Sequence, residues 1–121
     1  MRITSIALLA ASAALLAACS SAPVPREQMA VAKSAVERVN TNPAIVSSAP
    51  VELQAARDKL ARAERAMSNR DYVQARRLAE QASVDARLAE SKTAALRGES
   101  AVREVQDSIR SLDDELQRRG Q

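Results

Sequence analysis

The side chain with the clearest potential for chemistry is that of Cys19, the single cysteine among 121 residues. A cysteine thiolate is a reactive nucleophile. The chain has no histidine, so Cys19 lacks the usual partners for a zinc or haem site and a base that titrates near neutral pH. A lone cysteine also cannot close a disulfide within its own chain. The residues that precede Cys19 therefore decide which chemistry it undergoes.

These residues form an apolar run typical of a secretory signal peptide. Arg2 supplies a positive charge, Ile3 to Leu16 carries none, and small residues follow at 17 and 18. This is the order of a charged segment, an apolar segment and a cleavage site. The run is shorter than the roughly 20 apolar residues that span a bilayer. We predict that residues 1–18 are a signal peptide that is removed, and an incidental thiol after an ordinary signal peptide is the alternative.

The tetrad Leu16-Ala17-Ala18-Cys19 resembles the lipobox of bacterial lipoproteins. The resemblance implies that signal peptidase II recognises Leu16, Ala17 and Ala18. It also implies that the Cys19 sulfur receives a diacylglyceryl group and that the new amino group of Cys19 is acylated, for example with palmitate. Buried acyl carbon contributes ~0.8 kcal/mol per CH₂, so several chains form a stable membrane anchor.

Ser20 follows the cysteine where enterobacterial lipoproteins kept in the inner membrane have Asp. The resemblance therefore implies a lipid-anchored protein on the periplasmic side of the outer membrane of a Gram-negative bacterium. Residues 19–25 would be the lipidated cysteine and a tether, and residues 26–121 a single helical domain.

The composition of the rest of the chain argues against an enzyme and against nucleic-acid binding. Basic and acidic residues alternate instead of forming a one-sided basic stripe, and the net charge is only +3 before the signal peptide is lost. Tyr72 is the single aromatic residue, and no nucleophile–base pair is recognisable. We expect no catalytic residues, no metal, no cofactor and no small-molecule substrate.

The apolar periodicity predicts an all-α fold, an antiparallel helical hairpin with a short N-terminal helix and a long, coiled-coil-like C-terminal helix. Alanine is abundant and there are two glycines, which favours helices that pack closely. Helical spacing of apolar residues predicts helices over about 26–40, 50–68 and 71–119, with 44–49 as a loop. Asn69 is expected to take the left-handed conformation that ends the second helix, and Asp71 to cap the third.

A second apolar stripe follows the alanine-rich seam of the last helix. Its members recur at spacings of 3 and 4 with charged residues on either side, and they are Val102, Val105, Ile109, Leu112 and Leu116. This pattern is typical of a coiled-coil seam, and it predicts an interface for self-association or for another helical protein. Two alternatives are that the first helix folds back over the stripe, or that this segment is only partly ordered.

The hairpin carries the residues of a further resemblance: Ala49-Pro50, Glu52-Leu53, Ala55-Ala56-Arg57 and Leu60, then Asp71-Tyr72, Ala75-Arg76, Leu78-Ala79, Gln81-Ala82, Asp85-Ala86 and Leu88-Ala89. It is similar to the bacterial domain-of-unknown-function 4398 lipoproteins over residues 25 to 98. That family implies a short alanine-rich helical protein of the Gram-negative envelope, and it supplies no catalytic residues.

These observations favour a non-enzymatic, lipid-anchored envelope protein whose helical domain is a scaffold or adaptor for protein–protein interaction. The alternative is a homo-oligomeric structural spacer between the outer membrane and the peptidoglycan.

Overall fold

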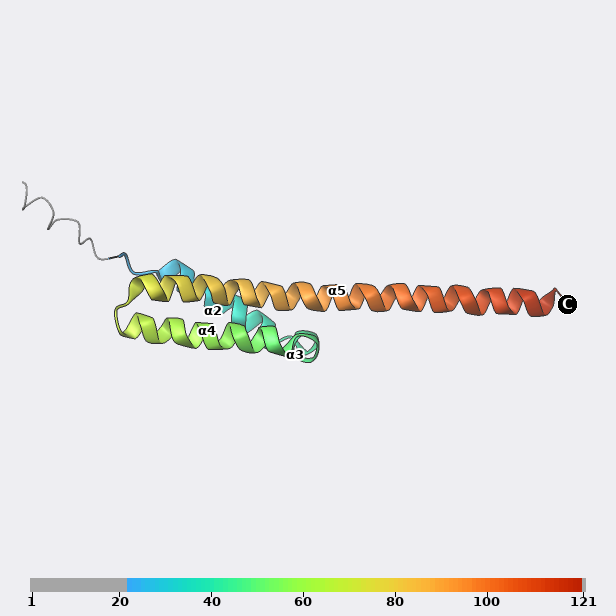
Figure 1. Cartoon of the computed structure of the whole chain (residues 1–121), viewed down its shortest axis with the longest axis horizontal. Helices are drawn as coiled ribbons and strands as arrows, with labels where there is room; N and C mark the ends of the chain where they lie inside the picture. Colours follow the sequence, from blue (N-terminus) through green and yellow to red (C-terminus); the bar gives the residue numbers. More distant parts are fainter. Residues whose placement is uncertain (1–21, 121) are drawn as a thin grey trace, which may run out of the picture.

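The structure is a computed structural model that describes residues 22–120, and this part of the chain is helical without any strand. The helices are α2 (Arg26–Asn40), α3 (Pro43–Ser48), α4 (Pro50–Ser68) and α5 (Tyr72–Arg119). The first three pack beside the N-terminal part of α5, and its C-terminal part extends alone (Figure 1). The prediction of an all-α hairpin with one long C-terminal helix is confirmed.

Small side chains on α5 form the centre of the core. Ala75, Ala79, Ala82, Ala86 and Ala89 are completely buried. Leu53, Ala56 and Ala63 of α4 are buried opposite them, and Leu60 and Met67 pack against the same cluster. Alanine adds little bulk, so the axes of α4 and α5 can approach closely while the larger side chains of α4 fill the remaining space. Met29, Val36 and Val39 of α2 complete the core.

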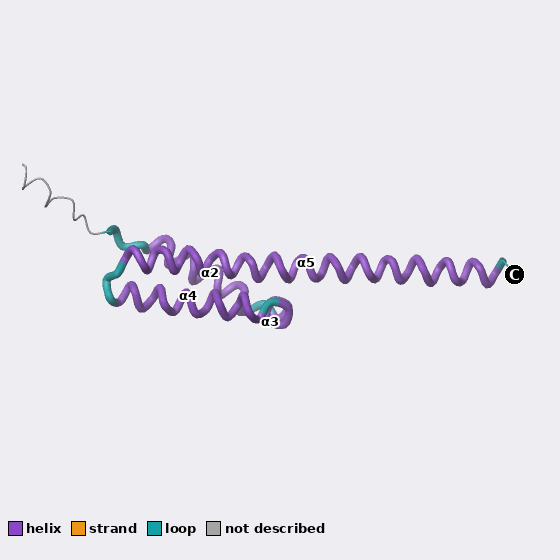
Figure 2. Tube along the Cα trace, viewed as in Figure 1, coloured by secondary structure: helices purple, strands orange, loops and turns teal. Residues whose placement is uncertain are grey.

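A tight turn makes α4 and α5 antiparallel (Figure 2). Arg70 has a φ of 59°, and the amide of Asp71 donates to the carbonyl of Ala66 at 2.9 Å, as in the common left-handed helix ending. The expectation that Asn69 takes the left-handed conformation is wrong, because its φ is −82° and the next residue, Arg70, takes that conformation instead. Asp71 caps α5 as predicted, and its side chain accepts a hydrogen bond from the amide of Gln74 at 3.1 Å.

The expectation of a loop over 44–49 is wrong, because residues 43–48 form the short helix α3. The Asn42 side chain accepts a hydrogen bond from the amide of Ala44 at 3.1 Å, and Pro43 occupies the first helical position, where its missing N–H costs nothing. Ile45 is buried and fixes α3 on the core, whereas Val46 is exposed. A helix of six residues is too short to show the periodicity from which longer helices are predicted.

Ion pairs between helices fix the packing of the hairpin. The Lys59 ammonium lies 2.5 Å from the Asp85 carboxylate, and the Lys92 ammonium lies 2.8 Å from the Glu52 carboxylate, so α4 and α5 are joined at two levels. The guanidinium of Arg38 donates to Glu90 at 2.7 Å and joins α2 to α5. The hydrogen bond from Lys92 lowers the pKa of Glu52 below its ordinary range.

This lowered pKa makes one contribution to stability depend on pH. Because the folded pKa of Glu52 is below the unfolded one, its pairing with Lys92 stabilises the fold above the unfolded pKa and is lost as pH falls through the folded pKa. We expect Glu52→Gln to lower the urea midpoint at pH 7 and to have little effect near pH 2. Glu99→Gln, on the part of α5 that has no neighbouring helix, is the control. An equal loss for Glu52→Gln at both pH values would contradict the assignment.

Candidate functional site

The five residues of the predicted interface lie along one exposed face of α5. Val102, Val105, Ile109, Leu112 and Leu116 are each between 57% and 68% exposed. They follow each other along about 21 Å of helix, at 1.5 Å per residue. Ala101, Val102, Val105 and Gln106 line a shallow apolar depression of about 280 Å³ beside this face. We refer to the five residues as the stripe.

The stripe faces away from the side on which α4 packs. On a helix that turns by about 100° per residue, its mean direction lies about 140° around the axis from the buried alanines of α5. The helix is continuous through Gly98, where an added Cβ would meet nothing within 4 Å. The change of apolar face therefore occurs within an unbroken helix.

Within residues 22–120, no other helix covers the stripe. All residues from Ala94 to Gly120 are exposed. The alternative that the first helix covers the stripe is wrong, since α2 lies against the earlier part of α5 and is joined there by Arg38 and Glu90. The buried face of α2 carries Met29, Val36 and Val39, which is the face that α4 and α5 need to complete their core.

Charged residues around the stripe pair within α5 itself. Arg103 lies 4.0 Å from Glu99, Arg110 lies 2.5 Å from Asp107, and Arg119 lies 2.9 Å from Glu115. Exposed pairs of this kind contribute about 0.2–1 kcal/mol each. They support the isolated helix and leave the apolar stripe open between them.

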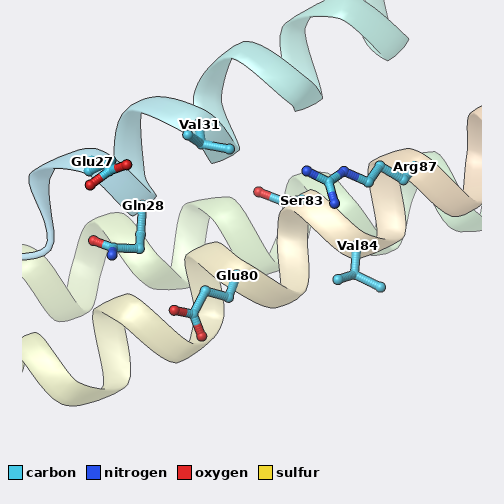
Figure 3. A pocket seen from close by; sticks show the side chains of 7 residues that line it. All are labelled: Glu27, Gln28, Val31, Glu80, Ser83, Val84 and Arg87. Carbon is cyan, nitrogen blue, oxygen red and sulfur yellow. The ribbon is translucent and has the colours of Figure 1, made fainter.

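Within the described residues, the groove between α2 and α5 does not hold a nucleophile beside a base. A groove of about 300 Å³ lies between α2 and α5, lined by Glu27, Gln28, Val31, Glu80, Ser83, Val84 and Arg87 (Figure 3). The Ser83 hydroxyl donates to the carbonyl of Ala79, and Glu80 pairs with Arg76, so neither is positioned as a nucleophile with a base. Over the described residues, no group of three potential metal ligands comes together.

The predicted anchor residues Leu16, Ala17, Ala18 and Cys19 lie outside the described residues. The chain enters the structure at Ala22, which lies beside the turn between α4 and α5 and lines a surface cavity with Arg70 and Tyr72. The stripe therefore begins about 45 Å along α5 from this end. Across residues 22–120, no helix has the length and apolar character needed to span a membrane.

The sequence interpretation missed part of the exposed apolar surface of α5. Val84 and Leu88 are 60% and 53% exposed although they belong to the part of α5 that packs in the bundle. They lie at the same 3 and 4 spacing as the stripe, and that spacing was the available signal. The adjacent alanine seam gave a competing pattern, and only burial separates the two.

No curated protein matches the chain. A solved structure does match, and it supports the same fold. A DUF4398 family protein of Pseudomonas aeruginosa PAO1, solved by crystallography at 2.47 Å resolution, is 40% identical, with a TM-score of 0.66. The match covers 78% of this chain and 96% of that one.

Residues 27–105 match the family described as "Domain of unknown function (DUF4398)". The match includes α2 from its second residue, all of α3 and α4, and α5 as far as the first two residues of the stripe. It agrees with the resemblance of the hairpin over residues 25 to 98. The chain belongs to the DUF4398 family.

Proposed function

We propose that this protein is a lipid-anchored, non-enzymatic scaffold or adaptor of the Gram-negative envelope, facing the periplasm from the outer membrane. The observation that carries the proposal is the uncovered stripe on α5. Five aliphatic side chains more than half exposed, in a regular row, form the kind of surface that marks a protein–protein contact.

The tetrad that ends at Cys19 supports the anchoring part of the proposal. Cys19 would carry the lipid, and the short segment after it would join the lipid to α2. Because residue 22 lies at the start of α5, the membrane anchor and the stripe would be at opposite ends of the longest element. This arrangement separates attachment from recognition.

The bundle supports a binding role over catalysis. Its interior is filled by alanine, leucine and other apolar side chains, and charged groups at its surface such as Lys59, Asp85 and Arg38 are engaged in ion pairs. Catalysis needs a nucleophile, a base and a charge-stabilising group in one place, and the groove between α2 and α5 lacks that set.

A photo-crosslinking residue at Val105 in the lipid-bearing chain tests the role of the stripe in cells. We expect adducts with a protein partner, and Leu112→Asp on the same chain should reduce them at least tenfold, because a carboxylate buried in an apolar contact is strongly unfavourable. Ser111→Asp adds the same charge on another face of α5 and is the matched control. Equal adduct yields from both variants would show that the stripe is not the interface.

The same experiment separates binding from folding. Leu112 is exposed and distant from the core, so both variants should keep the helical circular dichroism and the melting temperature of the parent chain. If Leu112→Asp lost both its adducts and its helical signal, the missing adducts would be explained by unfolding and not by loss of the interface. In that case Val102→Asn, a milder change on the same face, replaces Leu112→Asp, and unchanged adducts with a folded Val102→Asn chain would contradict the proposal.

A further inference from the structure

The exposed apolar face of α5 is longer than the stripe. From Val102 towards the N-terminus, the same steps of 4 and 3 lead to residues that are all exposed and are small or aliphatic. We call the complete row the seam. It consists of Val84, Leu88, Ser91, Ala95, Gly98, Val102, Val105, Ile109, Leu112 and Leu116.

A row that alternates steps of 4 and 3 without interruption has a period of 3.5 residues. That period keeps a row of side chains facing a partner helix when two helices wind around each other in a left-handed coiled coil. The seam extends over about 50 Å, and a helix is about 10 Å wide, so two paired helices would bury roughly 1,000 Å² in total. This area reaches the lower limit for a specific interface.

We infer that the seam binds a second copy of this chain, with the two α5 helices antiparallel and the two-fold axis near Ser100. This inference rests on the proposed role of α5 in protein association and names the partner. The seam lies away from the side on which α4 packs, and its N-terminal residue Val84 lines the groove between α2 and α5 together with Val31. A second helix would therefore run free of α4 and would enter that groove beside α2.

The order of small and large residues favours the antiparallel orientation. The middle of the seam is small, with Ser91, Ala95 and Gly98, and the C-terminal part is large. In a parallel pair in register, each small residue would face its own copy, and three successive layers would be poorly filled, which costs stability.

In the antiparallel pair each small residue meets a larger one. Gly98 faces Val102 of the second copy, Ala95 faces Val105, and Ser91 faces Ile109. The outer layers join Leu88 to Leu112 and Val84 to Leu116. Every layer therefore contains at least one branched aliphatic side chain, as close packing of two helices requires.

Charge at the edge of the seam agrees with this register. Arg87, next to Leu88, would meet Glu115 of the second copy, whose carboxylate also lies 2.9 Å from Arg119 of its own chain. The symmetry of the pair forms this contact twice. Among the described residues Arg87 has no acidic group within 4 Å. It lines the groove between α2 and α5 together with Val31 and Val84 (Figure 3), where the C-terminal end of the second α5 would lie.

On the opposite edge of the seam, acidic residues of the two copies would approach each other at two kinds of contact. In each contact, one acidic residue already has a basic partner in its own chain. Asp85 would approach Asp113 of the second copy, and Glu99 would approach its own counterpart. Asp85 is paired with Lys59 at 2.5 Å, and Glu99 with Arg103 at 4.0 Å.

In this dimer the two ends that carry residue 22 would lie about 84 Å apart, at opposite ends of a rod.

Disulfide trapping in cells distinguishes the orientations. Two versions of the full chain are co-expressed with different tags, one with Leu88→Cys and the other with Leu112→Cys, and both keep Cys19. The antiparallel pair should give a disulfide between the two versions, with at least tenfold less of the 112–112 product. A version without an added cysteine measures any product that comes from Cys19.

Each outcome decides the inference. A dominant 112–112 or 88–88 product would overturn it in favour of a parallel pair. Absence of any dimer would overturn the second copy as the partner, and Leu112-sensitive adducts with a different protein at Val105 would then leave the proposed function standing. If neither the disulfide-linked dimer nor the Leu112-sensitive adducts were found, the inference and the proposed function would both be contradicted.

Charge reversal supplies a second readout that leaves the seam intact. Arg87→Glu in both versions should reduce the 88–112 product roughly tenfold, since two edge contacts become repulsive. Adding Glu115→Arg to both versions should restore the product. If Arg87→Glu reduces the product and Glu115→Arg does not restore it, the proposed register is contradicted.

Discussion

Replacing Cys19 by Ala should abolish incorporation of labelled palmitate and leave residues 1–18 on the chain. The thioether of the proposed anchor needs the cysteine sulfur, and cleavage before Cys19 is expected to depend on that modification. The measurement is metabolic labelling with palmitate, combined with the mass of the intact chain. Membrane fractionation alone does not decide the question, because an uncleaved apolar signal segment also binds membranes.

Ser20→Ala changes the neighbouring residue without removing the sulfur and is the matched control, with labelling and processing expected as in the parent chain. If Cys19→Ala were processed at the same site and labelled as strongly as the parent, the lipid-anchor proposal would be refuted. The scaffold role of α5 would then have to be considered without a membrane anchor.

Replacing Ala82 by Leu should be among the most destabilising single changes in the bundle. The Ala82 side chain is completely buried in the row of alanines where α5 packs closely against the other helices. Three additional carbons there would push the helices apart, and overpacking of this kind typically costs about 1–3 kcal/mol. For a domain of this size we expect the melting temperature to fall by roughly 4 °C or more for each kcal/mol.

Ala94→Leu is the matched control, since Ala94 belongs to the same helix and is exposed. Both residues are good helix formers, so this variant should melt within about 2 °C of the parent chain. Thermal unfolding followed by circular dichroism compares the two. An equal effect of both variants would mean that the contact at Ala82 is not tightly packed.

We expect stability and association to depend on different surfaces of the same helix. The buried alanines of α5 hold α2 and α4, whereas the seam that we infer to bind a second copy lies on the other side. A change such as Ala82→Leu should therefore disturb the bundle, and Leu112→Asp should disturb only association. Measuring both properties for both variants would show whether the two faces are independent.

The sequence alone determined the helices and their order. Repeated apolar residues such as Leu53, Leu60 and Met67 set the faces of the helices, Asp71 capped α5, and Pro50 marked the start of α4. These are local properties, since a side chain and its neighbours within one or two turns decide them. The error at α3 has the same cause, because a helix of only six residues, from Pro43 to Ser48, offered too little pattern.

Only the tertiary structure decided which apolar faces are covered. The sequence left open whether the first helix lies over Val102 to Leu116, because an amphipathic helix does not specify which of several apolar faces it will bury. Packing of α2 beside the alanine seam of α5, closed by Arg38 and Glu90, resolved this. It left the stripe open and showed that Val84 and Leu88 extend it. Burial depends on contacts between residues far apart in the chain, and for that reason the full seam became visible only in the folded molecule.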